Sequence, residues 1–118
     1  IYLGEVAEKL SKDEAQKLIK ELLEIPENLK IVMEREDVIK RLATKYSKEK
    51  DIFYLGRGLD YLVAMEGSLK LKEISYIHSE AYAAGELKHG TIALIEHGTV
   101  VFALATQEEL LEKTISNI

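Results

Sequence analysis

The 118-residue sequence contains no cysteine and no tryptophan, and Pro26 is its single proline. Without cysteine, disulfide bonds, thiolate catalysis and cysteine-ligated zinc or iron–sulfur sites are excluded, and a reducing cytoplasmic location is expected. No apolar run approaches the roughly 20 residues that a membrane-spanning helix needs. No signal-peptide pattern precedes the first expected helix, which fits the same location.

The chain also lacks an excess of positive charge. It contains 16 Lys and Arg residues and 21 Asp and Glu residues, which gives a formal net charge of -5. Nucleic acids and anionic membranes are bound by clustered Lys and Arg, so neither is expected as a partner. With 47% hydrophobic and 31% charged residues, the composition is that of one folded domain with a packed core.

The first 50 residues carry a helical pattern. Ser11 and Glu14 have the spacing of a capping box, which predicts that a helix begins there. Pro26 is expected to end this helix and to start the next, which would continue to Tyr46. Residues 1–50 are therefore predicted to form a helical hairpin that leads into the following domain. The apolar positions that support the two helices are Ala15, Leu18, Ile19, Leu22, Leu23, Leu29, Val32, Met33, Ile39, Leu42, Ala43 and Tyr46.

From Asp51 onward the pattern alternates between strands and helices. Buried strands are expected at residues 52–55, 79–82 and 99–105, and helices at 60–77, 85–95 and 107–118, the second weakened by Gly90. This alternation predicts an α/β fold, a three-layer sandwich around a parallel sheet. Three strands make a small sheet, so residues 51–118 are interpreted as an incomplete domain of a longer protein.

Three charged residues interrupt the apolar helix predicted at residues 60–77. On a helical wheel, Glu73 lies about 20° to one side of Glu66, and Lys70 lies about 40° to the other. The same arc holds most of the large apolar side chains of this helix, whereas the opposite arc is polar. The wheel therefore predicts that the three charges face the core. The apolar residues on their arc are Leu62, Val63, Leu69, Ile74 and Ile77, and the polar residues opposite are Ser68, Lys72 and Ser75.

Two interpretations of such buried charges remain open. Glu66 and Lys70 could form a structural ion pair, because charges in a core must be paired or neutralised. Alternatively, the helix lines a cleft in which Glu73 transfers protons. Burial would raise the pKa of Glu73 and Lys70 would lower it, which would suit a base acting next to a carbonyl or imine.

The histidines and the glycine-rich turn give no cofactor or metal motif. His78, His89 and His97 stand 11 and 8 residues apart, spacings that match no metal site. His78 and Glu80 resemble part of a zinc-deaminase signature, but the cysteines it requires are absent. After Gly56 and Gly58, the third glycine of a dinucleotide fingerprint is missing. The two glycines are expected to serve a tight strand-to-helix turn.

Residues 66–90, EGSLKLKEISYIHSEAYAAGELKHG, closely resemble the isomerase half of the glucosamine-6-phosphate synthases, the glutamine–fructose-6-phosphate amidotransferases. LGRG at residues 55–58 and the preceding helices fit the same region, the second of two sugar-isomerase (SIS) domains. The resemblance implies that Glu73 is the base that moves a proton between C1 and C2 of the sugar. It places Lys70 in the same site, with Glu66 as a supporting residue.

The resemblance further implies that His89 assists sugar-ring opening in the site of a neighbouring subunit, and hence a homodimer. The ligands would be fructose 6-phosphate and glucosamine 6-phosphate, with no cofactor. Three parts of the family's machinery are absent: the N-terminal cysteine of the glutaminase half, the Ser/Thr cluster that holds the sugar phosphate, and a Schiff-base lysine in a tail beyond Ile118. Thr91 replaces a proline found in many relatives, a change expected to be harmless. The fragment alone is therefore expected to be inactive.

Other functions fit the same residues. One alternative is a deglycase or deaminase that uses this fold on an amino-sugar phosphate. Another is a non-catalytic SIS module that binds a sugar phosphate and controls a DNA-binding partner, and a third is a purely structural dimerisation fragment. A glutaminase domain in the parent protein would favour the synthase over these alternatives.

Overall fold

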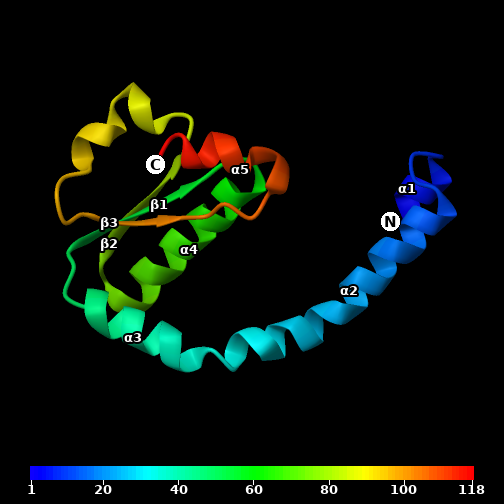
Figure 1. Cartoon of the computed structure of the whole chain (residues 1–118), viewed down its shortest axis with the longest axis horizontal. Helices are drawn as coiled ribbons and strands as arrows, with labels where there is room; N and C mark the ends of the chain where they lie inside the picture. Colours follow the sequence, from blue (N-terminus) through cyan, green and yellow to red (C-terminus); the bar gives the residue numbers. More distant parts are fainter. The chain divides into compact units, whose positions relative to one another are not determined.

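The computed structural model describes all residues from 1 to 118 and divides them into two compact units, Ile1–Lys45 and Tyr46–Ile118 (Figure 1). The first unit holds α1 (Tyr2–Val6), α2 (Lys12–Met33) and most of α3 (Glu36–Tyr46). No helix combines the length and apolar character needed to cross a bilayer.

The predicted capping box begins α2. The Ser11 hydroxyl accepts a hydrogen bond from the Glu14 backbone N–H at 3.3 Å, and the Ser11 N–H donates to the Glu14 carboxylate at 2.9 Å. These bonds satisfy backbone donors that the first helical turn cannot pair internally. The hydrogen bonds from Ser11 also lower the pKa of the Glu14 carboxyl.

Pro26 does not end this helix, contrary to the prediction. It lies inside α2, which continues for seven more residues to Met33. A proline within a helix removes one backbone hydrogen bond, here the bond to the Leu22 carbonyl. Leu22 is exposed, so solvent can hydrogen-bond this carbonyl and the helix tolerates the interruption.

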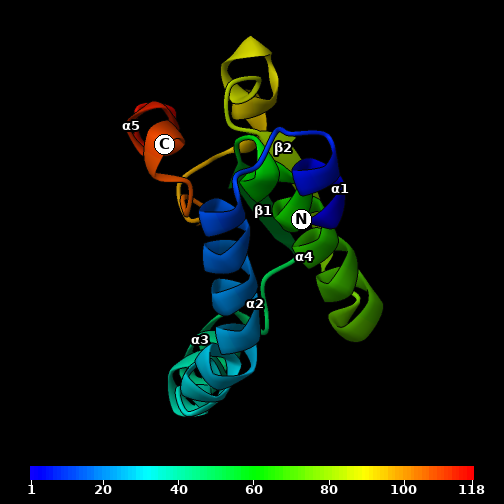
Figure 2. The same cartoon turned by 90° about the vertical axis from the view of Figure 1, so that its right-hand side faces the viewer.

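Two long helices form, but the break between them is not at Pro26 and they do not fold back on each other as a hairpin. Only Glu34 and Arg35 separate them, and turn hydrogen bonds run from Arg35 N–H to the Val32 carbonyl and from Val38 N–H to the Arg35 carbonyl. Because helical bonding nearly continues through the junction, α2 and α3 follow one bent path (Figures 1 and 2). Their apolar side chains therefore remain exposed, with Ala15 the one buried residue of the two helices.

The second unit is an α/β layer, as predicted. Its strands are β1 (Asp51–Gly56), β2 (His78–Ala83) and β3 (Val100–Ala103), all parallel and in the order β2-β1-β3. Helix α4 (Leu59–Ser75) and helix α5 (Glu108–Ile115) lie on opposite sides of this sheet (Figure 2). Ile52, Phe53 and Leu55 of the central strand are buried and form the centre of the core.

The helix predicted at residues 85–95 is replaced by two short 3-10 turns, η1 (Leu87–His89) and η2 (Thr91–Leu94). Gly90 separates them with φ at +144°, a conformation that is open to glycine and that no helical residue adopts. The turns carry the chain from the carboxyl end of β2 back toward the start of β3.

Small side chains form the contact between α4 and the sheet. Ala64 and Ser68 are buried there, and a methyl group placed on Gly67 would lie 3.1 Å from the Tyr54 ring. The Ser68 and Ser79 hydroxyls lie 3.0 Å apart, and the Ser79 hydroxyl donates to the Ser68 carbonyl at 2.8 Å. Helix and strand are thus joined by a buried polar pair.

We predict that Ser79→Ala lowers the free energy of unfolding by about 1–3 kcal/mol, because it leaves the buried Ser68 hydroxyl without its partner. The double variant Ser68→Ala/Ser79→Ala should lose less than the sum of the two single variants, since no unpaired group remains. Urea denaturation of the four chains measures both effects. Strictly additive losses would contradict a direct Ser68–Ser79 interaction.

Candidate functional site

The three charged residues of α4 form a connected group. The Lys70 ammonium lies 2.8 Å from the Glu73 carboxylate and 3.6 Å from that of Glu66. Spacings of three and four residues bring side chains to the same face of a helix, which is why the group forms locally. The pKa of Lys70 is raised, mainly by its hydrogen bond to Glu73 and then by the charges of Glu73 and Glu66.

The prediction that this group faces the core is wrong for this chain. The side chains of Glu66, Lys70 and Glu73 are 63%, 56% and 50% exposed. Ser68, predicted on the wet face, is instead buried against the sheet. The helix packs on the sheet through its small residues, because they allow the two backbones to approach closely. Side-chain size therefore decided which face of α4 meets the sheet, whereas hydrophobicity alone predicted the opposite face.

The wheel nevertheless grouped the outward-facing residues correctly. We call the exposed surface of α4 around Lys70 the α4 outer face. Several of its large apolar side chains are exposed beside the charged group, although a domain usually buries such residues. The exposed apolar members are Leu62, Val63, Leu69 and Ile74.

His89 does not join the group on α4. It ends η1, its imidazole is 71% exposed, and its Nδ1 lies 2.9 Å from the Glu86 carboxylate. Because α4 runs from the carboxyl end of β1 to the amino end of β2, Glu73 lies near the amino edge of the sheet. The last turn of α4 and the segment after β2 lie at opposite ends of the strands (Figure 1). His89 follows the carboxyl end of β2, so one chain holds Glu73 and His89 at opposite edges of the sheet.

The turn after β1 requires its two glycines, as predicted. A methyl group on Gly56 would lie 2.4 Å from the Asp60 carbonyl carbon and oxygen, a distance that no side chain can occupy. Gly58 has φ at +58° and ψ at -126°, a combination that other residues rarely adopt. The turn therefore brings the start of α4 directly against the end of β1.

The sequence reasoning missed a hydrogen-bond network at the carboxyl edge of the sheet. The buried Asp60 carboxylate accepts bonds from the Thr106 N–H at 2.8 Å, the Thr106 hydroxyl at 2.5 Å and the Gln107 N–H at 3.4 Å. The Gln107 side-chain amide donates to the Arg57 carbonyl at 2.6 Å. An Asp in the first helical turn after a glycine-rich turn was the available signal, but its partners are 46 and 47 residues away.

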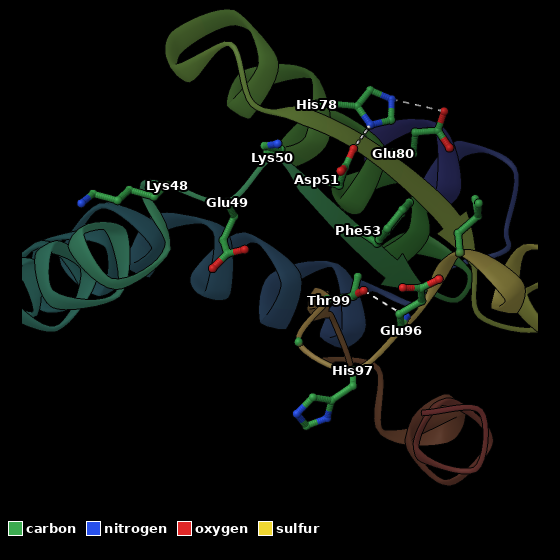
Figure 3. A pocket seen from close by; sticks show the side chains of 12 residues that line it. Lys48, Glu49, Lys50, Asp51, Phe53, His78, Glu80, Glu96, His97 and Thr99 are labelled. Carbon is green, nitrogen blue, oxygen red and sulfur yellow. Dashed lines mark hydrogen bonds and ion pairs between the residues drawn. The ribbon is translucent and has the colours of Figure 1, made fainter.

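A cavity of about 710 Å³ lies at the amino edge of the sheet (Figure 3). His78 stands at its rim, with Nδ1 2.9 Å from the Asp51 carboxylate and Nε2 3.7 Å from that of Glu80. Neither the charged group of α4 nor His89 lines it, and no three His, Asp or Glu side chains in the chain are placed to hold a metal ion. The lining residues are Lys48, Glu49, Lys50, Asp51, Phe53, His78, Glu80, Leu94, Glu96, His97, Gly98 and Thr99.

The parallel sheet, with α4 on one side and α5 on the other, has the architecture of a sugar-isomerase domain. The model of the SIS domain family matches residues 45–117, and the chain belongs to that family.

Within the family, the chain is similar to the glutamine–fructose-6-phosphate aminotransferases (isomerizing). It is 60% identical over all 118 residues to the enzyme of Clostridium tetani, of which it covers 19%. It is 46% identical over 113 residues to that of Methanosarcina acetivorans, of which it covers 18%. The chain thus spans about a fifth of the length of these relatives.

A solved structure gives the same likeness. The C-terminal domain of glucosamine-fructose-6-phosphate aminotransferase from Francisella tularensis superposes with a TM-score of 0.91 at 40% sequence identity. The match covers 96% of this chain and 32% of that one.

We predict that Asp60→Asn weakens the dependence of stability on acidic pH. The Thr106 hydroxyl, followed by backbone donors, lowers the pKa of Asp60, so the folded state prefers the ionised carboxylate. This stabilisation is complete above the ordinary Asp pKa of about 4 and is lost as the pH falls through the lower folded value. Measured by urea unfolding, the free energy of unfolding should fall less steeply between pH 6 and pH 3 for Asp60→Asn than for wild type. Asp13→Asn, which changes an exposed carboxylate, is the control and should follow the wild-type slope. Equal slopes for Asp60→Asn and wild type would contradict the network.

Proposed function

We propose that this chain is part of the isomerase half of a glutamine–fructose-6-phosphate aminotransferase, which makes glucosamine 6-phosphate from fructose 6-phosphate and glutamine. The observation that carries the proposal is 60% identity over the whole chain to an enzyme of that name. The substrates are sugar phosphates, and the protein works in the cytoplasm without a nucleic-acid or membrane partner.

Glu73 is the base of the isomerisation in this proposal. Ammonia released from glutamine adds to the C2 carbonyl of fructose 6-phosphate, and loss of water leaves an imine at C2. The Glu73 carboxylate takes a proton from C1, the C–H electron pair forms a C1–C2 double bond, and the imine nitrogen is protonated. Return of the proton to C2, together with loss of the C1 hydroxyl proton, gives the amino sugar with an aldehyde at C1. Such a transfer needs a carboxylate within hydrogen-bond reach of both carbons and no metal or organic cofactor.

Lys70 holds the base in position. Its ammonium group donates to Glu73 at 2.8 Å, and its raised pKa keeps it charged. A cation beside the carboxylate orients it through a charge-assisted hydrogen bond. Glu66, at 3.6 Å from the same ammonium, supports Lys70 from one turn earlier in the helix.

The α4 outer face must be covered for this chemistry. Proton transfer to carbon is favoured where water is excluded, and half of the Glu73 side chain is exposed in this chain. The apolar residues around the charged group suit contact with another part of a longer protein. The isolated chain, which covers a fifth of its relatives, is therefore inactive in this proposal.

His89 acts in the site of a second subunit, which makes the enzyme a homodimer. The supporting observation is topological: His89 and Glu73 lie at opposite edges of one sheet. A single chain cannot direct both side chains at one sugar, whereas two chains related by a two-fold axis can exchange their His89 segments. The imidazole would then assist opening of the sugar ring.

We predict that Glu73→Gln in the full-length protein lowers the rate of glucosamine 6-phosphate formation by about 10²- to 10⁴-fold, the usual contribution of a general base. Glutamine hydrolysis should stay near the wild-type rate, since it takes place in another part of the protein. Coupled assays of the amino sugar and of glutamate measure the two activities separately.

Glu109→Gln is the matched control, because Glu109 is an exposed carboxylate on α5. Normal amino-sugar formation by Glu73→Gln would exclude Glu73 as the base. A wild-type parent that hydrolyses no glutamine would instead favour the deglycase or deaminase alternative.

A further inference from the structure

Arg57 is the central residue of the turn that joins β1 to α4, and the backbone of this turn is held from three directions. The Gly56 carbonyl accepts from the Ala84 N–H at 2.8 Å. The Arg57 carbonyl accepts from the Asp60 N–H at 3.2 Å and from the Gln107 side chain at 2.6 Å. The position from which the Arg57 side chain departs is therefore fixed.

The Arg57 guanidinium occupies the space beside Gly85. A methyl group on Gly85 would lie 3.0 Å from Nη2 and 3.5 Å from both Cζ and Nη1 of Arg57. Nη2 would thus lie closer than in most contacts, whereas Cζ and Nη1 would lie at ordinary contact distance. Gly85 has no positive φ, so the close approach of Arg57, and not backbone geometry, is what a side chain at this position would disturb.

The charge of Arg57 has no structural partner. No carboxylate lies within ion-pair distance of it, and its Nε is buried without a hydrogen-bond partner. A buried unpaired donor is costly and calls for an explanation. A Lys at this position would have no Nε–H to bury, and its flexible side chain could reach solvent. The planar shape of the guanidinium, and not its charge, therefore explains why Arg57 fits beside Gly85.

The segment that starts at Gly85 carries His89. The Glu86 N–H donates to the Ala83 carbonyl at 2.8 Å, and Leu87 is buried in the core. Further along, the His89 N–H donates to the Glu86 carbonyl at 2.9 Å. Because these hydrogen bonds connect neighbouring residues, a displacement of the backbone at Gly85 would also displace the His89 imidazole four residues later.

We propose that Arg57 is a positioning residue for His89. Its guanidinium, seated against Gly85, sets the path of residues 84–89 and thereby the place at which His89 is presented to a second subunit. The role in turnover rests on the proposed function, whereas the effect on the geometry of His89 does not. Displacements of about 1 Å in a catalytic group can cost about 100-fold in rate, so a residue that touches no substrate can still limit kcat.

The experiment compares Arg57→Ala and Gly85→Ala in the full-length protein. The first variant removes the guanidinium and the second displaces it while Arg57 is retained. Arg57→Ala should lower kcat for amino-sugar formation by about 10- to 100-fold, and Gly85→Ala should lower it by less, because it shifts the guanidinium without removing it. In both variants KM for fructose 6-phosphate should change less than about twofold. In a His89→Ala background, Arg57→Ala should have little further effect, because the group that it positions is absent. Arg57→Lys should lower kcat about as much as Arg57→Ala does, because an ammonium group lacks the planar shape of the guanidinium.

A second readout is independent of activity. The imidazole proton resonances of His89 should shift in Arg57→Ala and in Gly85→Ala, but not in Arg41→Ala, which removes an exposed arginine of α3. Unshifted His89 resonances would overturn the proposal, as would equal kcat losses from Arg57→Ala in the wild-type and His89→Ala backgrounds. If the wild-type protein makes no amino sugar, the proposed function fails, and the His89 resonances alone decide the role of Arg57.

Discussion

The close packing of α4 on the sheet is the contact on which the arrangement of the second unit depends. Ala64, Gly67 and Ser68 bring the helix near enough for the Ser68 and Ser79 hydroxyls to meet at 3.0 Å. With its small residues directed inward, the helix must present its larger side chains outward. The charged group around Lys70 and its apolar neighbours are therefore exposed on the α4 outer face.

The two edges of the sheet differ in how firmly they are held. At the carboxyl edge, Asp60 and Gln107 join the turns after β1 and β3, and the guanidinium of Arg57 lies against the segment after β2. At the amino edge, the strands begin beside an open cavity whose rim carries His78. The segment that bears His89 lies at this carboxyl edge and is anchored to the core at Leu87.

Local patterns predicted most of the elements. Short runs between turn residues located all three strands, their alternation with helices predicted a parallel sheet, and the Ser11–Glu14 spacing located the start of α2. Predictions failed where the outcome depended on contacts distant in sequence. The small residues of α4 pack against Tyr54 and Ser79, and this contact decided which face of the helix meets the sheet. The Pro26 prediction failed for another reason, because solvent can hydrogen-bond the exposed carbonyl that the proline leaves unpaired. The Asp60 network and the Arg57–Gly85 contact join segments 28 or more residues apart, so one sequence does not identify the partners of these residues.

The orientation of α4 can be tested by thiol labelling, because the chain has no cysteine of its own. Single variants Glu73→Cys and Ser68→Cys are treated with a thiol reagent under native conditions, and the rates are compared with those in denaturant. The account predicts that the thiol at residue 73 reacts at nearly its unfolded rate, and that the thiol at residue 68 is protected by at least about tenfold. Protection at residue 73 with rapid labelling at residue 68 would mean that the helix packs through its charged face, which would contradict the account.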